Sequence, residues 1–304
     1  MQNIIAIIWD FDKTLVDGYM QDPIFEEYKI EAKAFWKEVN SLPKLYREEQ
    51  KVKVNPDTIY LNHFIKYAKE GKFAGLNNAK LKEFGSKLKF YPGIPDIFKT
   101  TKELLANDSV CKEYNIKVEH YIVSTGFAQV IRGSSVMEHI EDIWGCELIE
   151  APDPNLEGSS IISEIGFTID NSTKTRALFE INKGINKNQD INVNSKLSNE
   201  QRRIAFNNMI YIADGPSDVP AFSVVKGRGG ATFAIYPHGN EKAFKQVEQL
   251  REEGRIDMFA EADYSDKTTA SMWICNKVLE FAERIKKAEK SKHAGNFNTP
   301  THLI

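Results

Sequence analysis

Short apolar runs along the chain predict the strands of a buried sheet. Residues 4–9 are six apolar residues in a row, rich in isoleucine, and further runs lie at 118–123 and 209–213. Strands covered on both faces, as in a parallel sheet, have this pattern, and runs of this length are too short to span a membrane. Later strands are expected at 231–236 and 258–262. The predicted fold is therefore α/β, with a Rossmann-like doubly wound parallel sheet.

A long helical segment separates the first strand from the second. Its apolar residues recur at helical spacing, with Pro43, Gly71 and Gly75 as breaks. Helices are predicted there at 23–39, 57–69 and 78–88. Some seventy residues of helix between two strands of one sheet indicate an inserted subdomain. We expect a helical cap at 18–90, inserted into a core formed by 1–17 and 91–290.

The rest of the chain alternates between further helices and strands. Helices are expected at 96–105, from 171 onward, and at 219–225, 241–253 and 268–287. A β-hairpin is expected from 146–151 and 161–169. The polar, asparagine-rich segment 184–203 is expected to be a mobile loop, and 291–304 a flexible tail.

The first predicted strand stops at two acids, Asp10 and Asp12. Ligands bind beyond the carboxyl ends of the strands in open α/β sheets, and two carboxylates this close repel each other unless a cation lies between them. A hard divalent metal ion is the natural partner. The alternative is a local turn capped by Asp12. A calcium loop does not fit, because Thr14, Leu15 and Gln21 occupy positions that need an acid or amide, a glycine and a glutamate.

Polar residues also follow the second and third predicted strands. Ser124 and Thr125 end the second, just before a helix, so their hydroxyls and the free backbone N–H groups could hold an anion such as phosphate; an ordinary helix cap is the alternative. The third strand ends in Asp214 and Asp218. Lys174 lies in the first turn of the helix after 171, where a solvated surface lysine is the alternative.

The amino-acid composition limits which binding partners and which cellular compartment we expect for the protein. The hydrophobic share is 41%, the charged share 27%, and the net charge −3, which gives no reason to expect nucleic acid or an anionic membrane as partner. The three cysteines form no C-x-x-C pair and are typical of free thiols in a reducing compartment. No secretion signal is recognised at the N-terminus. We expect a soluble cytoplasmic protein, of an oligomeric state that the sequence does not indicate.

Taken in order, these residues resemble the four motifs of the haloacid dehalogenase-like (HAD) hydrolase superfamily. The motifs are Asp10-x-Asp12-x-Thr14, Ser124 after a strand, Lys174, and the pair Asp214 and Asp218. The resemblance covers roughly 1–17 and 91–288, and an insert directly after the first motif is similar to the C1-capped branch that includes phosphoserine phosphatase. The chain departs from the pattern at Ala213, where many relatives have glycine, and in the additional loop 184–203.

The resemblance implies a role for each motif residue. Asp10 would be the nucleophile that attacks phosphorus, and Asp12 the general acid and base. Mg²⁺ would be held by Asp10, by the backbone carbonyl of Asp12 and by Asp214, while Asp218 supports the metal site and orients Lys174. Ser124, Thr125 and Lys174 would bind the phosphoryl oxygens. The predicted function is a magnesium-dependent phosphatase that hydrolyses a small phosphomonoester through an aspartyl-phosphate.

Other functions on the same fold remain open at this stage. A dehalogenase does not fit, because those members use one aspartate and no metal. A phosphomutase, a phosphonatase and a non-catalytic phosphate-binding module stay as alternatives. The sequence does not identify the substrate: the aromatic and basic candidates in the cap are Tyr19, Trp36, Tyr46 and Arg47, and Trp36 is expected to belong to the core of the cap.

Overall fold

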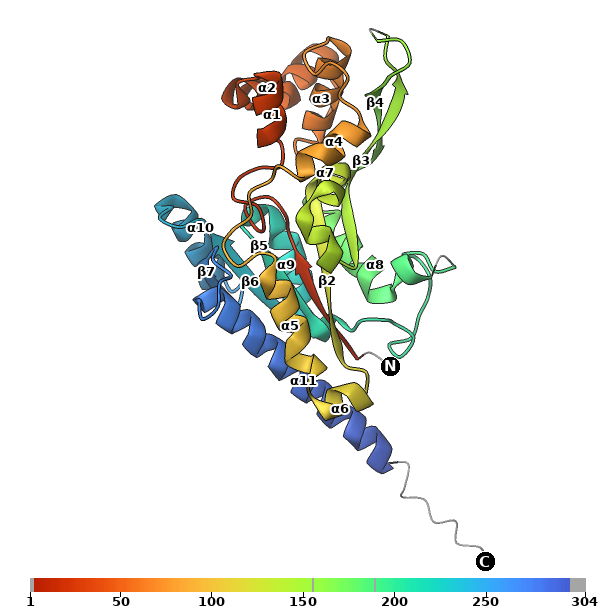
Figure 1. Ribbon diagram of the computed structural model, residues 1–304, viewed down its shortest axis with the longest axis vertical. Helices are drawn as coiled ribbons and strands as arrows, with labels where there is room; N and C mark the ends of the chain where they lie inside the picture. The colour runs from red at the N-terminus through yellow and green to blue at the C-terminus, as the bar shows by residue number, and fades with distance from the viewer. Residues whose placement is uncertain (1–2, 155, 189, 296–304) are drawn as a thin grey trace, which may run out of the picture.

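The computed structural model describes residues 3–154, 156–188 and 190–295, and shows a seven-stranded sheet in the order β4-β3-β2-β1-β5-β6-β7 (Figure 1). Neighbouring strands are parallel except β3 and β4, which form the predicted hairpin. The strands are β1 Ile4–Trp9, β2 Lys117–Phe127, β3 Asp142–Pro152, β4 Ser160–Phe167, β5 Met209–Ala213, β6 Ala231–Tyr236 and β7 Met258–Glu261. The predicted α/β fold class is confirmed.

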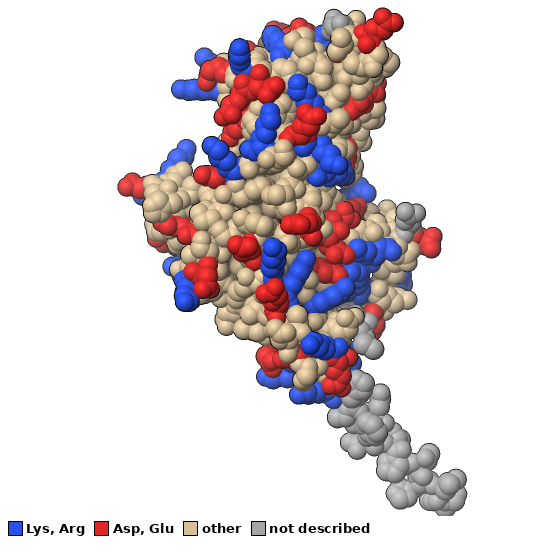
Figure 2. All heavy atoms as spheres, in the orientation of Figure 1, with Lys and Arg blue, Asp and Glu red and all other residues tan. Residues whose placement is uncertain are grey.

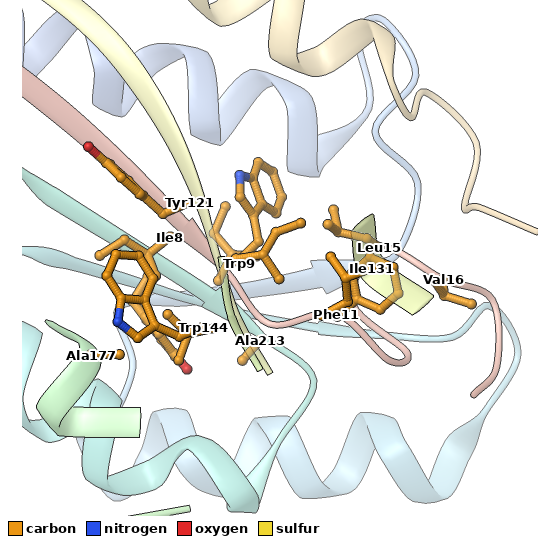
Figure 3. Close-up of a cluster of buried hydrophobic side chains, with 14 of the residues drawn as sticks. Ile8, Trp9, Phe11, Leu15, Val16, Tyr121, Ile131, Trp144, Ala177 and Ala213 are labelled. Carbon is orange, nitrogen blue, oxygen red and sulfur yellow. The ribbon is translucent and has the colours of Figure 1, made fainter. Parts of the chain in front are cut away.

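Strand β1 lies in the middle of the sheet, and every residue of it is buried. Its last residue, Trp9, is in register with Ile122 of β2 and Ile212 of β5, so these three parallel strands reach the same edge together. Figure 3 shows apolar side chains from β1 and the following loop packed with others from the neighbouring strands and from α7 and α8. This packing holds rigidly the backbone from which Asp10 and Asp12 extend.

Helices cover both faces of the sheet, as a doubly wound fold requires. Helix α5 packs with α11 on one face, and α8 packs with α9 on the other (Figure 1). The helices of this part are α5 Asp96–Ala106, α6 Ser109–Glu113, α7 Ala128–Gly133, α8 Lys174–Lys183, α9 Val219–Gly227, α10 Glu241–Glu252 and α11 Thr269–Gly295. The first five residues of the predicted tail, 291–295, continue α11, because good helix formers extend through residue 292. The rest of the predicted tail, 296–304, lies outside the described residues.

The helical insert, residues 18–90, contains α1 Asp22–Tyr28, α2 Ala32–Gln50, α3 Ile59–Lys69 and α4 Asn78–Gly85. The single helix predicted at 23–39 is wrong. Lys29 ends α1 in the left-handed conformation, and the Glu31 carboxylate starts α2 by accepting hydrogen bonds from the backbone N–H groups of Lys33 and Ala34. Pro43 does not break α2, whose later turns remain packed against the insert through Leu42 and Tyr46.

Aromatic side chains form the core of the helical insert. Phe25, Phe35, Phe64 and Phe73 are buried, and the rings of Phe64 and Phe73 stack with centroids 4.9 Å apart. Trp36, expected in this core, is only partly buried and lies at its edge, against Phe35 and Tyr60. Part of the Trp36 side chain is therefore left exposed.

The insert packs closely against two parts of the core. A Cβ added to Gly133 of α7 would lie 1.7 Å from the carbonyl oxygen of Lys82 in α4, so only glycine permits this approach. The β3–β4 hairpin lies beside α3 and α4, where the backbone N–H of Ile162 donates to the carbonyl of Leu76 at 2.9 Å (Figure 1). The hairpin, assigned to the core by the sequence, thus also supports the insert.

Charged side chains outside the site are paired or interspersed with side chains of opposite charge (Figure 2). Arg203, at the end of the polar segment 184–203, forms a bidentate ion pair with buried Glu119 of β2. Lysine and arginine are interspersed with acidic residues over the face shown in Figure 2. Among the described residues, none of the helices is both long and apolar enough to cross a membrane.

Candidate active site

The polar residues predicted at the strand ends meet at the carboxyl edge of the sheet. Asp10 follows β1, Ser124 lies near the end of β2, and Asp214 follows β5. Because β1 lies between β2 and β5, Asp10 has the other two on either side of it. The sequence therefore predicted correctly which edge carries the polar cluster.

Lys174 connects the first motif to the last. It is the first residue of α8, and its Nζ donates to Asp10 Oδ1 and to Asp218 Oδ1, both at 2.7 Å. The side chain is 1% exposed, so the alternative of a solvated surface lysine is wrong. Burial alone would lower the pKa of Lys174, but the carboxylates of Asp10 and Asp218 raise the pKa above its ordinary value, and the ammonium stays charged.

Further hydrogen bonds fix the two carboxylates that Lys174 joins. The hydroxyl of Thr14 donates to Asp10 Oδ2 at 3.0 Å. Tyr211 of β5 donates to Asp218 Oδ1 at 2.6 Å, and Ser217 donates to Asp218 Oδ2 at 2.8 Å. Sequence reasoning gave Tyr211 no role. The only signal was its place in β5, two residues before the strand ends.

The acidic residues fit a hard divalent cation. One carboxylate oxygen from each of Asp10, Asp214 and Asp218 lies within 4.8 Å of the others, and Lys174 is the cation that contacts two of these carboxylates. Burial, with the charges of Asp10 and Asp218, raises the pKa of Asp214 to about 7. This excess of negative charge, presented by oxygen ligands, is what Mg²⁺ would offset.

Asp12 lies apart from this cluster. Its Oδ1 accepts a hydrogen bond from the backbone N–H of Met20 at 2.9 Å, so the side chain is held toward the start of the helical insert. Burial and the nearby charge of Asp10 raise the pKa of Asp12 well above its ordinary value. The side chain is therefore positioned and poised differently from that of Asp10, although only one residue separates them.

Ser124 and Thr125 play different structural parts. The buried Ser124 hydroxyl accepts from the backbone N–H of Gly126 at 3.0 Å, and within the described residues its proton has no acceptor, so it is available to donate to an anion. Thr125 is fixed through its carbonyl oxygen, which accepts from the Tyr60 hydroxyl at 2.6 Å. This bond joins α3 of the insert to β2.

The residue pair Lys13 and Tyr19 borders the site; the sequence named Tyr19 among the candidates in the cap and gave Lys13 no role. Lys13 lies between Asp12 and Thr14 in the sequence and has φ 55°, a backbone conformation that favours glycine. Its ammonium donates to the Tyr19 hydroxyl and lies 4.1 Å from the centre of that ring. Lys13 also lines a cavity of about 300 Å³ together with Asp17 and Asp214. The pair therefore links the acidic cluster to the insert.

Comparison with known proteins gives one close relative in sequence. The chain is 36% identical over 288 residues to an uncharacterized protein of Borreliella burgdorferi, covering 91% of this chain and 97% of that protein. This chain belongs to the same family. No protein-family model matches it.

Solved structures resemble the chain more distantly. A HAD family hydrolase from Salmonella enterica subsp. enterica serovar Typhi has a TM-score of 0.49 and 16% identity, covering 84% of this chain and 66% of that one. A phosphoserine phosphatase in its apo form has a TM-score of 0.47 and 14% identity, covering 84% and 92%. Residues of three of the four motifs meet around Asp10 and Lys174 at the edge of a doubly wound sheet, as the resemblance implies.

Proposed function

We propose that this protein is a magnesium-dependent phosphatase that hydrolyses small phosphomonoesters through an aspartyl-phosphate. The observation that carries the proposal is the buried Lys174 ammonium bridging Asp10 and Asp218 at 2.7 Å each, beside the carboxylate of Asp214. A buried cation and a cluster of acids at one edge of the sheet suit the transfer of an anionic phosphoryl group.

In the first step, a carboxylate oxygen of Asp10 attacks phosphorus and the bond from phosphorus to the ester oxygen breaks. The carboxyl of Asp12 gives its proton to the departing oxygen, which leaves as an alcohol. The raised pKa of Asp12 supports this role, because it favours the protonated form that a general acid needs. Thr14 holds the other oxygen of Asp10 and so fixes the direction of attack.

In the second step, water attacks the phosphorus of the aspartyl-phosphate. Asp12, now ionised, accepts a proton from that water, the acyl-phosphate bond breaks, and inorganic phosphate leaves with Asp10 restored. Lys174 and the Ser124 hydroxyl donate to the phosphoryl oxygens in both steps, and Thr125 lies beside them. When bound, Mg²⁺ would be held by Asp10, Asp214 and the Asp12 carbonyl, supported by Asp218, and would offset the charge of the phosphoryl group.

The helical insert acts in this proposal as a cap. Its first residues and its last meet the core next to Gly18 and Gly93, whose φ angles of 123° and 83° favour glycine. The Tyr60–Thr125 and Met20–Asp12 hydrogen bonds tie the cap to the residues of the site. A cap over the acids excludes water and large substrates, which favours a small phosphorylated metabolite over a phosphoprotein.

A generic aryl phosphate tests the proposal. Purified protein should release phosphate from p-nitrophenyl phosphate when Mg²⁺ is present and stop when the metal is chelated. Activity should return on adding Mg²⁺ back. Phosphate release that is indifferent to chelation, or binding of phosphate without turnover, would contradict a metal-dependent phosphatase.

A further inference from the structure

A second cavity lies on the helical insert next to the proposed site. It has a volume of about 710 Å³ and is lined by Tyr19, Lys33, Trp36, Lys37 and Asn40. Tyr19 forms one wall, and its ring lies 6.4 Å from that of Trp36. Because Tyr19 also contacts Lys13, which lines the smaller cavity beside Asp214, one residue pair separates the two cavities.

A backbone hydrogen bond and the preceding glycine fix the position of Tyr19. Its backbone N–H donates to the Asp22 carboxylate at 2.9 Å, at the start of α1, and the residue is 41% exposed. Gly18 precedes it with φ 123°, which turns the chain out of the core. The ring is therefore held between Lys13 and Trp36, facing the cavity.

The cavity presents positive charge and an aromatic face. Lys33 and Lys37 are one helical turn apart on α2, and neither forms an ion pair with any residue that the structure describes. Trp36 lies between them in sequence, only partly buried, and within the same described part of the chain its indole N–H has no acceptor. Among the described lining residues none is acidic. An anion and a flat or apolar group fit here; an ammonium group does not.

Resting on the proposed phosphatase function, we propose that this cavity binds the leaving group of the substrate, and that the substrate carries a second anionic group there. The transferred phosphoryl lies against Asp10, Lys174 and Ser124. The rest of the molecule extends past the Lys13–Tyr19 pair, packs on Trp36, and places a carboxylate or second phosphate at Lys33 and Lys37. These two lysines are then specificity-determining residues.

A matched pair of substrates tests the inference. Phenyl phosphate and 4-carboxyphenyl phosphate share the reacting group and differ in one added carboxylate. The wild type should show a higher kcat/KM for the carboxylated ester. In Lys33→Met/Lys37→Met, the ratio of the two kcat/KM values should fall on the order of tenfold, as two charge-assisted contacts at a partly open site allow.

Two control variants separate a binding role from a structural one. Lys33→Arg/Lys37→Arg keeps both charges and should keep most of the preference. Lys44→Met removes a lysine from the same helix that pairs with Glu48 away from the cavity, and should leave the ratio at its wild-type value. A ratio that is the same in all four proteins would overturn the inference.

A second pair of substrates tests whether the cavity disfavours an ammonium group, as the lack of an acidic lining residue implies. O-phosphoserine and its hydroxy-acid analogue differ in having an ammonium or a hydroxyl group beside the carboxylate, and the hydroxy acid should be the better substrate. A strong preference for phosphoserine would overturn the inference. Magnesium-dependent hydrolysis without any of these preferences would leave the phosphatase proposal intact, whereas no hydrolysis of any ester would overturn both.

Discussion

At the scale of single residues, the proposed chemistry depends on how Asp10 and Asp12 divide the work. Asp10 contacts Lys174 and belongs to the acidic cluster, whereas the Asp12 side chain turns toward Met20. A nucleophile has to be ionised and aimed, while a general acid has to keep its proton until the leaving oxygen needs it. Burial raises the pKa of both carboxyls, but the Lys174 ammonium opposes the rise at Asp10, whereas at Asp12 the Met20 backbone N–H opposes it and the pKa stays well above its ordinary value.

Asp12→Asn tests this division. The amide can still accept from the Met20 N–H, and the carboxylates of the metal site are untouched, so Mg²⁺ affinity measured by calorimetry should stay close to wild type. Turnover of an aryl phosphate should fall by about 10²- to 10⁴-fold, the usual contribution of general acid–base catalysis. A collapse of metal affinity in this variant would contradict the assigned role.

The residues that sequence could predict are those at the ends of apolar runs. Asp10, Ser124 and Asp214 each follow such a run, so their meeting at one edge follows from a parallel sheet. Tyr211 and the Lys13–Tyr19 pair could not be predicted, because their contacts depend on side-chain direction and on how the insert folds back. Residue type marked Tyr19 as an aromatic candidate in the cap but gave no sign of its contact with Lys13 or of the role of Tyr211.

At the scale of elements, the strands were predicted better than the helices of the insert. The runs at 4–9, 209–213 and 231–236 coincide with β1, β5 and β6, because buried parallel strands are apolar throughout. The break at Lys29 was missed, since the apolar spacing continues across it while a carboxylate cap at Glu31 starts a new helix. The contact between the hairpin and the insert joins segments far apart in sequence, and no local pattern reports it.

The close approach of α4 and α7 gives a prediction for Gly133. In Gly133→Ala, the new Cβ would meet the Lys82 carbonyl, so α4 has to move away, at a cost of about 1–3 kcal/mol. Thermal unfolding should show a lower Tm. Gly227→Ala is the matched control, because a Cβ there has nothing within 4 Å and its Tm should stay near wild type. Equal Tm values for both variants would contradict the observed packing.

Buried His120 of β2 gives a prediction for pH. Its Nδ1 accepts from the Trp9 indole at 3.1 Å and its Nε2 contacts the Thr101 hydroxyl at 3.0 Å. Burial lowers the pKa of His120 from 6.5 to about 3, so the folded protein holds a neutral imidazole. The stability that this site contributes is therefore present above pH 6.5 and is lost as pH falls from 6.5 toward 3.

His120→Gln should make the fall in stability shallower in that window. In this pH range the variant takes up one proton fewer than the wild type when it unfolds. The slope of its free energy of unfolding against pH should therefore be smaller by about 1.4 kcal/mol per pH unit. Urea titrations at several pH values measure the slope. His238→Gln is the control, because the hydrogen bond to Glu261 raises the pKa of His238, so its effect on the slope lies above pH 6.5 and the slope between pH 6.5 and 3 should stay that of the wild type. An unchanged slope in His120→Gln would show that another group dominates.

At the scale of the whole molecule, the core and the insert enclose the acidic edge from two sides. Packing of α4 on α7 and of the hairpin on α3 holds the insert close to the core (Figure 1). We therefore expect small aryl phosphates to be hydrolysed with a higher kcat/KM than phosphoserine or phosphotyrosine peptides of eight or more residues. Phosphate release from both classes under identical conditions checks this. A preference for peptides would contradict a cap that restricts access.

The most direct test of the account is the activity of Asp10→Asn. The amide has the shape of the carboxylate but cannot attack phosphorus, so the account predicts a folded protein, with a circular dichroism spectrum like that of the wild type, that releases no phosphate from p-nitrophenyl phosphate above background at saturating Mg²⁺. Near wild-type turnover by this variant would show that Asp10 is not the nucleophile and would contradict the proposed mechanism.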